Sequence, residues 1–299
     1  MSINETASPD KVLLETYSDA PAQQPRQPPS AAINPDDPPW GLSQAVLVWV
    51  ISVVLLFFVP LLAIIPYIAY KVLAQGSTEG LGTDANLIFI SILAVLPTHI
   101  LTFLVVWFVV TSRGRRPFWE TLGWSWPRNF GPWRTIGLAI LLLLVAGLIT
   151  RFLGGGETQL ERIINSSLKT RFATACLAAL TAPLVEELIY RGVLYSAFQR
   201  AIGTTAAIVM VSALFAGVHV LQYFNNLGVI AVITLLSVSL TLLRARTGRV
   251  LPSYVMHLVF NGVQAVILIV EPFVGKPSPE NTSQIGLLVL SFIRLRLLT

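Results

Sequence analysis

Three ionisable side chains lie inside one long apolar run of the sequence: Glu186, Glu187 and Arg191. A charge at the centre of a membrane-spanning helix costs about 3 kcal/mol on insertion scales, so such residues are candidates for a functional site. In a helix, Glu187 and Arg191 would share a face about 6 Å apart along the axis, in the order that favours an ion pair. That pair could serve only to neutralise two charges in the bilayer. Glu186 points about 100° away and lacks an obvious partner in its own helix, so its carboxylate must be desolvated, protonated, or facing water or a partner helix.

Two imidazoles follow in later apolar runs, each with a partner at four-residue spacing. Phe215 and His219 share one helix face, flanked by small residues that let a neighbouring helix approach closely. His257 and Asn261 share a face in a further run. Either histidine alone is typical of an interhelical hydrogen bond, but both together with a free carboxylate favour catalysis. The third histidine, His99, has no acid or amide at helical spacing, and we interpret it as a polar packing residue.

The composition predicts that these residues belong to an integral membrane protein. Of 299 residues, 54% are hydrophobic and only 12% are charged. A hydrocarbon core about 30 Å thick needs roughly 20 residues of helix, and backbone groups in lipid must be satisfied within the helix. We therefore expect an all-α polytopic bundle of seven or eight transmembrane helices within residues 40–299. The expected segments are 42–70, 87–110, 136–150, 173–198, 204–221, 229–243 and 251–270, with 285–298 as the short eighth.

The ends and loops of the chain predict how it sits in the membrane. Residues 1–39 are rich in Pro, Gln, Ser and Asp, and we expect them to form a disordered acidic tail. The basic residues elsewhere lie mainly in short loops, where the expected partner is membrane lipid with anionic headgroups and not nucleic acid. Their distribution favours a cytoplasmic N-terminus. Trp40 and Tyr195, near the ends of expected spans, are interpreted as interfacial anchors.

The residues singled out above form three ordered motifs in separate spans. The motifs are Glu186-Glu187-x-x-x-Arg191, Phe215-x-x-x-His219 and His257-x-x-x-Asn261. Their types and order resemble those of the CAAX protease and bacteriocin-processing family (CPBP, also called Abi), which consists of polytopic intramembrane endopeptidases. The resemblance implies hydrolysis of a peptide bond in a membrane-associated or prenylated, CAAX-type protein or peptide.

The resemblance also implies a role for each motif residue. Glu186 and His219 would activate the attacking water, and His257 and Asn261 would stabilise the oxyanion of the tetrahedral intermediate. The residues that would support this site are Glu187, Arg191 and Phe215.

The same residues are compatible with a metal-dependent and with a metal-free site. Glu186, His219 and His257 are also a familiar zinc ligand set with an open position for water, so the cofactor is either none or one divalent metal such as zinc. Asn261 is a better oxyanion donor than zinc ligand, and no HExxH motif is present, which favours a metal-free site.

Two other classes of function fit parts of the same pattern. A non-catalytic binding or bacteriocin-immunity module of the same family would keep the helices without turnover. A transporter or proton relay would also bury Glu and His, but it usually shows internal repeats, and we see none that is convincing.

Overall fold

The computed structural model describes residues 33–274 except 77 and 157, and every regular element in this part of the chain is a helix. The expected all-α class is thus confirmed for the described residues. The described residues from Asn34 to Val274 belong to one compact unit, which is the unit described below. The expected eighth span, 285–298, and residues 1–32 of the expected tail lie outside the described residues.

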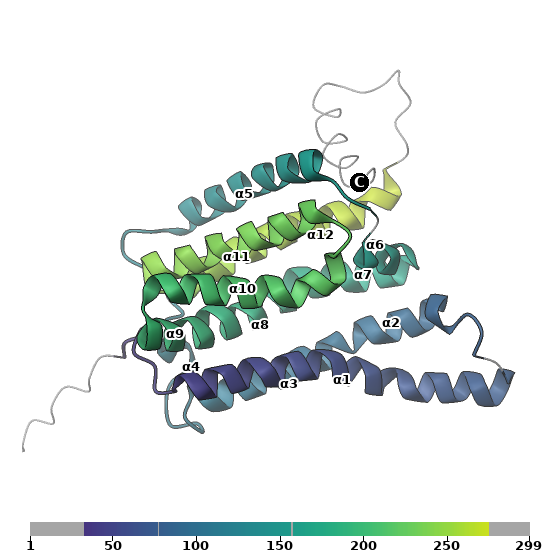
Figure 1. The fold of residues 1–299 in the computed structure, drawn as a ribbon, viewed down its shortest axis with the longest axis horizontal. Helices are drawn as coiled ribbons and strands as arrows, with labels where there is room; N and C mark the ends of the chain where they lie inside the picture. The colour runs from purple at the N-terminus through teal and green to yellow at the C-terminus, as the bar shows by residue number, and fades with distance from the viewer. Residues whose placement is uncertain (1–32, 77, 157, 275–299) are drawn as a thin grey trace, which may run out of the picture. The chain divides into compact units, whose positions relative to one another are not determined.

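The helices follow one another along the chain with short connections (Figure 1). The helices that make up the bundle are α1 (Leu42–Gln75), α2 (Ala85–Leu93), α3 (Val95–Val110), α5 (Pro132–Leu153), α7 (Leu168–Cys176), α8 (Ala182–Glu187), α9 (Tyr195–Ile202), α10 (Thr204–Tyr223), α11 (Leu227–Thr247) and α12 (Leu251–Val270). The remaining elements are the short α-helices α4 (Phe118–Thr121) and α6 (Gln159–Asn165), the 3₁₀ turns η2 (Leu81–Thr83) and η5 (Glu271–Phe273), and the π-helical segments η3 (Leu177–Thr181) and η4 (Leu188–Leu194).

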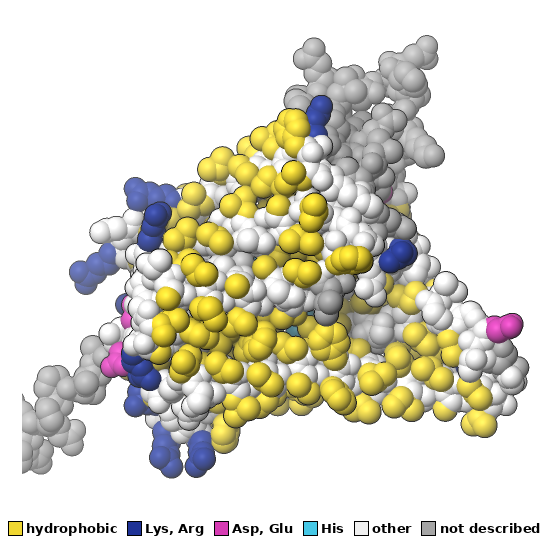
Figure 2. Space-filling view, viewed as in Figure 1, with side chains coloured by type: hydrophobic (Ala, Val, Ile, Leu, Met, Phe, Trp, Pro, Cys, Tyr) yellow, Lys and Arg dark blue, Asp and Glu magenta, His cyan; other side chains and the backbone are white. Residues whose placement is uncertain are grey.

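Six helical stretches of the described residues are long and apolar enough to cross a membrane. The apolar part of α10, Thr204–Val220, is shorter and is not among them. Hydrophobic side chains cover the visible face of the bundle, while Lys and Arg gather mainly at the end where α1 begins (Figure 2). The six stretches are Leu42–Ala74, Ala85–Val110, Pro132–Leu153, Leu168–Ile202, Leu227–Thr247 and Leu251–Phe273.

The stretch from α7 to α9 is the centre of the bundle. It packs against α1 and α3 on one side and against α10, α11 and α12 on the other, while α5 covers α11 and α12 (Figure 1). All seven residues of η4 are buried. In the most apolar 18-residue stretch of α1, by contrast, only 11% is buried inside the protein. Exposed apolar side chains such as Phe57 and Phe58 on α1 suit contact with lipid. The motif-bearing helix therefore lies inside the protein, and α1 faces outward.

Two π-helical turns interrupt this central helix, and a proline explains the first. Pro183 has no backbone N–H and its ring crowds the preceding turn, so an α-helical hydrogen bond cannot form there. The turn before it widens, and the Ala182 N–H bonds to the carbonyl of Leu177, five residues back. In η4 the Tyr195 N–H likewise bonds to the Tyr190 carbonyl. Such π turns inside α-helices are rare and occur frequently at functional sites.

The last residues of the range expected as a tail pack on the bundle. Asp36 forms an ion pair with Arg244 on α11 at 2.8 Å. Trp40 is 2% exposed and donates from Nε1 to the Val193 carbonyl at 3.1 Å. Tyr195 is also fully buried. The interpretation of Trp40 and Tyr195 as interfacial anchors is therefore wrong, because the Trp40 indole is buried against η4 and the Tyr195 ring is buried beside Arg244 of α11.

Candidate active site

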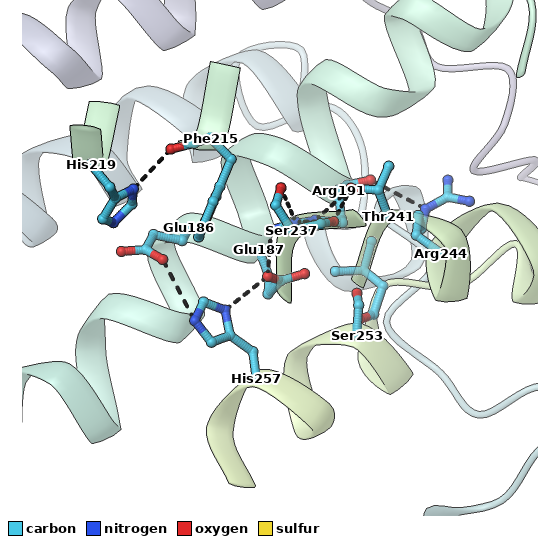
Figure 3. A network of polar contacts seen from close by, with 11 residues as sticks. Glu186, Glu187, Arg191, Phe215, His219, Ser237, Thr241, Arg244, Ser253 and His257 are labelled. Atoms are coloured by element: carbon cyan, nitrogen blue, oxygen red, sulfur yellow. Dashed lines mark hydrogen bonds and ion pairs between the residues drawn. The ribbon is translucent and has the colours of Figure 1, made fainter. Parts of the chain in front are cut away.

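A buried ion pair lies at the centre of the site. Arg191 donates from Nη1 to Glu187 Oε1 at 2.8 Å, and neither side chain is exposed to solvent. Arg191 also donates to the carbonyl and hydroxyl of Ser237 at 2.9 and 3.0 Å, and to Thr241 Oγ1 at 3.3 Å (Figure 3). The expected pairing of Glu187 with Arg191 is confirmed. The contacts from α11 supply the further hydrogen bonds that a buried guanidinium requires.

His257 lies between the two adjacent glutamates (Figure 3). Its Nδ1 is 2.9 Å from Glu187 Oε1, and its Nε2 is 3.7 Å from Glu186 Oε2. Because a carboxylate accepts hydrogen bonds, the Nδ1–H donates to Glu187, which sets the orientation of the ring. The Glu186 side chain is 25% exposed, whereas those of Glu187 and His257 are 0% and 2% exposed. Glu186 is therefore the carboxylate of the pair that water can reach.

Phe215 on α10 connects the parts of the site through its ring. The ring stacks on His219 with centroids 4.8 Å apart and meets the edge of Tyr190 at 5.0 Å. The Arg191 guanidinium carbon lies 4.8 Å from its centroid, a cation–π distance, and the His257 ring is 6.1 Å away. Phe215 thus packs between two imidazoles and the buried arginine.

His219 is oriented by its own helix. Its Nδ1 lies 2.8 Å from the Phe215 carbonyl, which can only accept, so Nδ1 carries the hydrogen. In the neutral ring the lone pair is then on Nε2, and the side chain is partly exposed. The Glu186 carboxylate approaches the His257 ring, and His219 joins the network through Phe215 (Figure 3).

Asn261 is held by the first π turn. Its Nδ2 donates to the Ala178 carbonyl at 3.0 Å. Pro183, five residues after Ala178, has no N–H to offer that carbonyl. The amide nitrogen has two hydrogens, so one remains available to a ligand. His99 is linked to the same π turn, with Nδ1 2.8 Å from Thr181 Oγ1.

Sequence reasoning missed the polar residues of α11 that complete the network. Ser237 and Thr241 are fully buried and Arg244 is 1% exposed. The two hydroxyl residues lie within the segment expected at 229–243, and Arg244 follows it directly. These polar residues recur every three to four positions, so the sequence indicates that they share one helix face. Small hydroxyl side chains are, however, common in membrane helices for other reasons.

The side chains as placed do not form a metal-binding cluster. Throughout the described part of the chain, no group of three or more His, Cys, Asp and Glu residues could hold a metal ion. Glu186 and His257 approach each other, but His219 is turned to its own helix backbone. The ligand set considered from the sequence, Glu186 with both histidines, is thus not assembled.

Fold and site together define a polytopic integral membrane protein with paired carboxylates and imidazoles inside its helices. Residues 168–263 match the family model described as Rce1-like, type II CAAX prenyl endopeptidase Rce1-like. The matched part runs from the start of α7 into α12 and contains all three motifs. The resemblance to the CAAX protease and bacteriocin-processing family is confirmed by this match. No curated protein and no solved structure matches the chain at a significant level.

Proposed function

We propose that this protein is an intramembrane endopeptidase that hydrolyses a peptide bond in a membrane-associated or prenylated, CAAX-type protein or peptide. The observation that carries the proposal is the position of His257 between Glu186 and the buried Glu187. The family match supports a peptidase of this class. The geometry supports a reactive role for the partly exposed Glu186 and a supporting role for the buried Glu187.

Glu186 and His219 activate the attacking water in this proposal. Both side chains are partly exposed, and His219 Nε2 has the free lone pair. The carboxylate accepts a proton from water as the water oxygen bonds to the peptide carbonyl carbon, and the carbonyl electron pair moves to its oxygen. When the C–N bond breaks, the proton is delivered to the leaving amine.

His257 and Asn261 stabilise the negative oxygen formed in that step. His257 in its doubly protonated form donates from Nε2, since Nδ1–H is already committed to Glu187. The second amide hydrogen of Asn261 is the other donor, because the first is committed to Ala178. Removal of one such donor lowers turnover by roughly 100-fold or more in other hydrolases.

We further propose that α10 crosses the membrane as a seventh helix. At 20 residues it is about 30 Å long, which suits the hydrocarbon core. The gathering of Lys and Arg at the end where α1 begins supports a cytoplasmic position for the N-terminal end.

The test compares Glu186→Gln with Glu120→Gln, a matched change at an exposed carboxylate on α4. Purified proteins are given farnesylated CAAX peptides, the same peptides without the lipid, and a transmembrane peptide. We expect cleavage by the wild type and the Glu120 variant, and a loss of about 100-fold or more in Glu186→Gln with unchanged thermal stability. Absence of wild-type cleavage across the panel, or full activity of Glu186→Gln, would contradict the proposal. Parallel reactions with a chelator test the need for a metal.

A further inference from the structure

Arg244 is a buried cation outside the three motifs. It lies in the last turn of α11 with 1% of its side chain exposed. Its Nη1 is 2.8 Å from Asp36 Oδ1, and its Nη2 donates to the Pro35 carbonyl at 3.3 Å. A buried guanidinium is costly unless it is paired and hydrogen-bonded, so these contacts hold the segment before α1 against α11.

The third contact of Arg244 reaches the motif-bearing helix. Its Nε donates to the backbone carbonyl of Arg191 at 3.2 Å. Trp40, from the same N-terminal segment as Asp36, donates to the Val193 carbonyl two residues further along η4. Two side chains from outside the π-helical turn therefore hold two of its carbonyls. One of these carbonyls belongs to the residue whose side chain anchors Glu187.

We infer that Arg244 and Asp36 are positioning residues for the proposed hydrolysis, on which this inference rests. Arg244 fixes the backbone of Arg191, the Arg191 side chain fixes Glu187, and Glu187 fixes the His257 ring. Asp36 holds Arg244 in place from the other side. Through Asp36 and Arg244, the segment that precedes the first span thus supports the position of the proposed catalytic groups.

A neighbouring ion pair provides the contrast that makes the inference testable. Asp37 pairs with Arg200 at 3.2 Å, but their side chains are 70% and 43% exposed. Exposed pairs of this kind contribute little to stability. Asp37 and Asp36 are adjacent in sequence, and only the Asp36 pair leads through Arg244 to Arg191.

The experiment compares Asp36→Asn with Asp37→Asn in the full chain, using peptide cleavage per mole of folded protein. We expect Asp36→Asn to lower kcat roughly tenfold with KM within about twofold, because small displacements of catalytic groups reduce the chemical step. Asp37→Asn should match the wild type. A merely structural role of Asp36 would lower the melting temperature and leave kcat of the folded protein unchanged, and that result would overturn the inference.

A second pair of variants covers the case in which the first does not fold. Arg244→Lys keeps the charge but not the forked contacts to Asp36, Pro35 and Arg191. It should lower kcat, and Arg246→Lys, at an exposed position on the same helix, should not. Equal kcat in both Lys variants would overturn the inference while the proposed function stood. A wild type that cleaves no peptide would overturn the proposed function and this inference with it.

Discussion

Two adjacent glutamates in one helix have opposite surroundings. Glu187 is fully buried, and its Oε1 accepts from both Arg191 and His257. The Glu186 side chain is one quarter exposed, and its Oε2 is 3.7 Å from His257 Nε2, beyond hydrogen-bond distance. The surroundings of Glu187 hold a buried charge in place, whereas those of Glu186 leave its carboxylate free to exchange a proton with water.

This difference shows how a membrane protein can contain a reactive carboxylate. A helix rotates by about 100° per residue, so one neighbour can face a polar network while the other faces water. The network makes the buried charges tolerable through partners on α11 and α12.

The largest effect is expected from Glu187→Gln. The change leaves Arg191 as a buried charge without a counterion, which costs about 3–5 kcal/mol in comparable buried pairs. It also releases the His257 ring, so activity should fall as well. Unfolding in detergent measures the first effect and peptide cleavage the second. A double variant, Glu187→Gln with Arg191→Met, should recover stability but not activity, and failure to recover any stability would contradict the ion-pair account.

Asn261→Leu should act mainly on the reaction. It removes the proposed oxyanion donor, and we expect kcat to fall by roughly 100-fold. It also leaves the Ala178 carbonyl without its donor, at a cost of about 1–3 kcal/mol. Thr234→Val, at an exposed hydroxyl on α11, is the control. Equal kcat for the two variants would show that Asn261 does not act as an oxyanion donor.

Phe215→Leu should have a moderate effect on both stability and turnover. It removes the stack on His219 and the cation–π contact with Arg191, interactions worth about 0.5–2 kcal/mol each. We expect reduced stability and a reduction of turnover by several-fold, read from melting curves and initial rates. Unchanged turnover would show that the orientation of His219 does not depend on this ring.

The smallest effect is expected at Asp84, before α2 and away from the network. Hydrogen bonding to the Lys71 ammonium lowers the pKa of Asp84 to about 2. Because the folded pKa is below the unfolded value, the stabilisation is present above about pH 4 and is lost as the pH falls towards 2. Asp84→Asn, which keeps a helix-capping side chain, should lower the melting temperature slightly at pH 6 and by less at pH 2.5. A large loss at pH 6 would contradict the expectation that this partly exposed pair, with side chains 23% and 12% exposed, contributes little.

The sequence by itself determined what depends on local geometry and composition. The helical membrane class follows from long apolar segments, because lipid offers the backbone no hydrogen-bond partners. The Glu187–Arg191 pair follows from four-residue spacing, since the helix alone brings the two side chains together. The three motifs were enough to indicate the family that the match over residues 168–263 supports.

Only the tertiary structure decided which distant groups meet. His257 is seventy residues from Glu187 in sequence, and their hydrogen bond exists because α12 packs against α8. The burial of Arg244, and of Trp40 against η4, depends on the segment before α1 reaching that turn. Spacing within one helix sets a residue's direction, but its partner is set by the packing of other helices, which no local pattern contains.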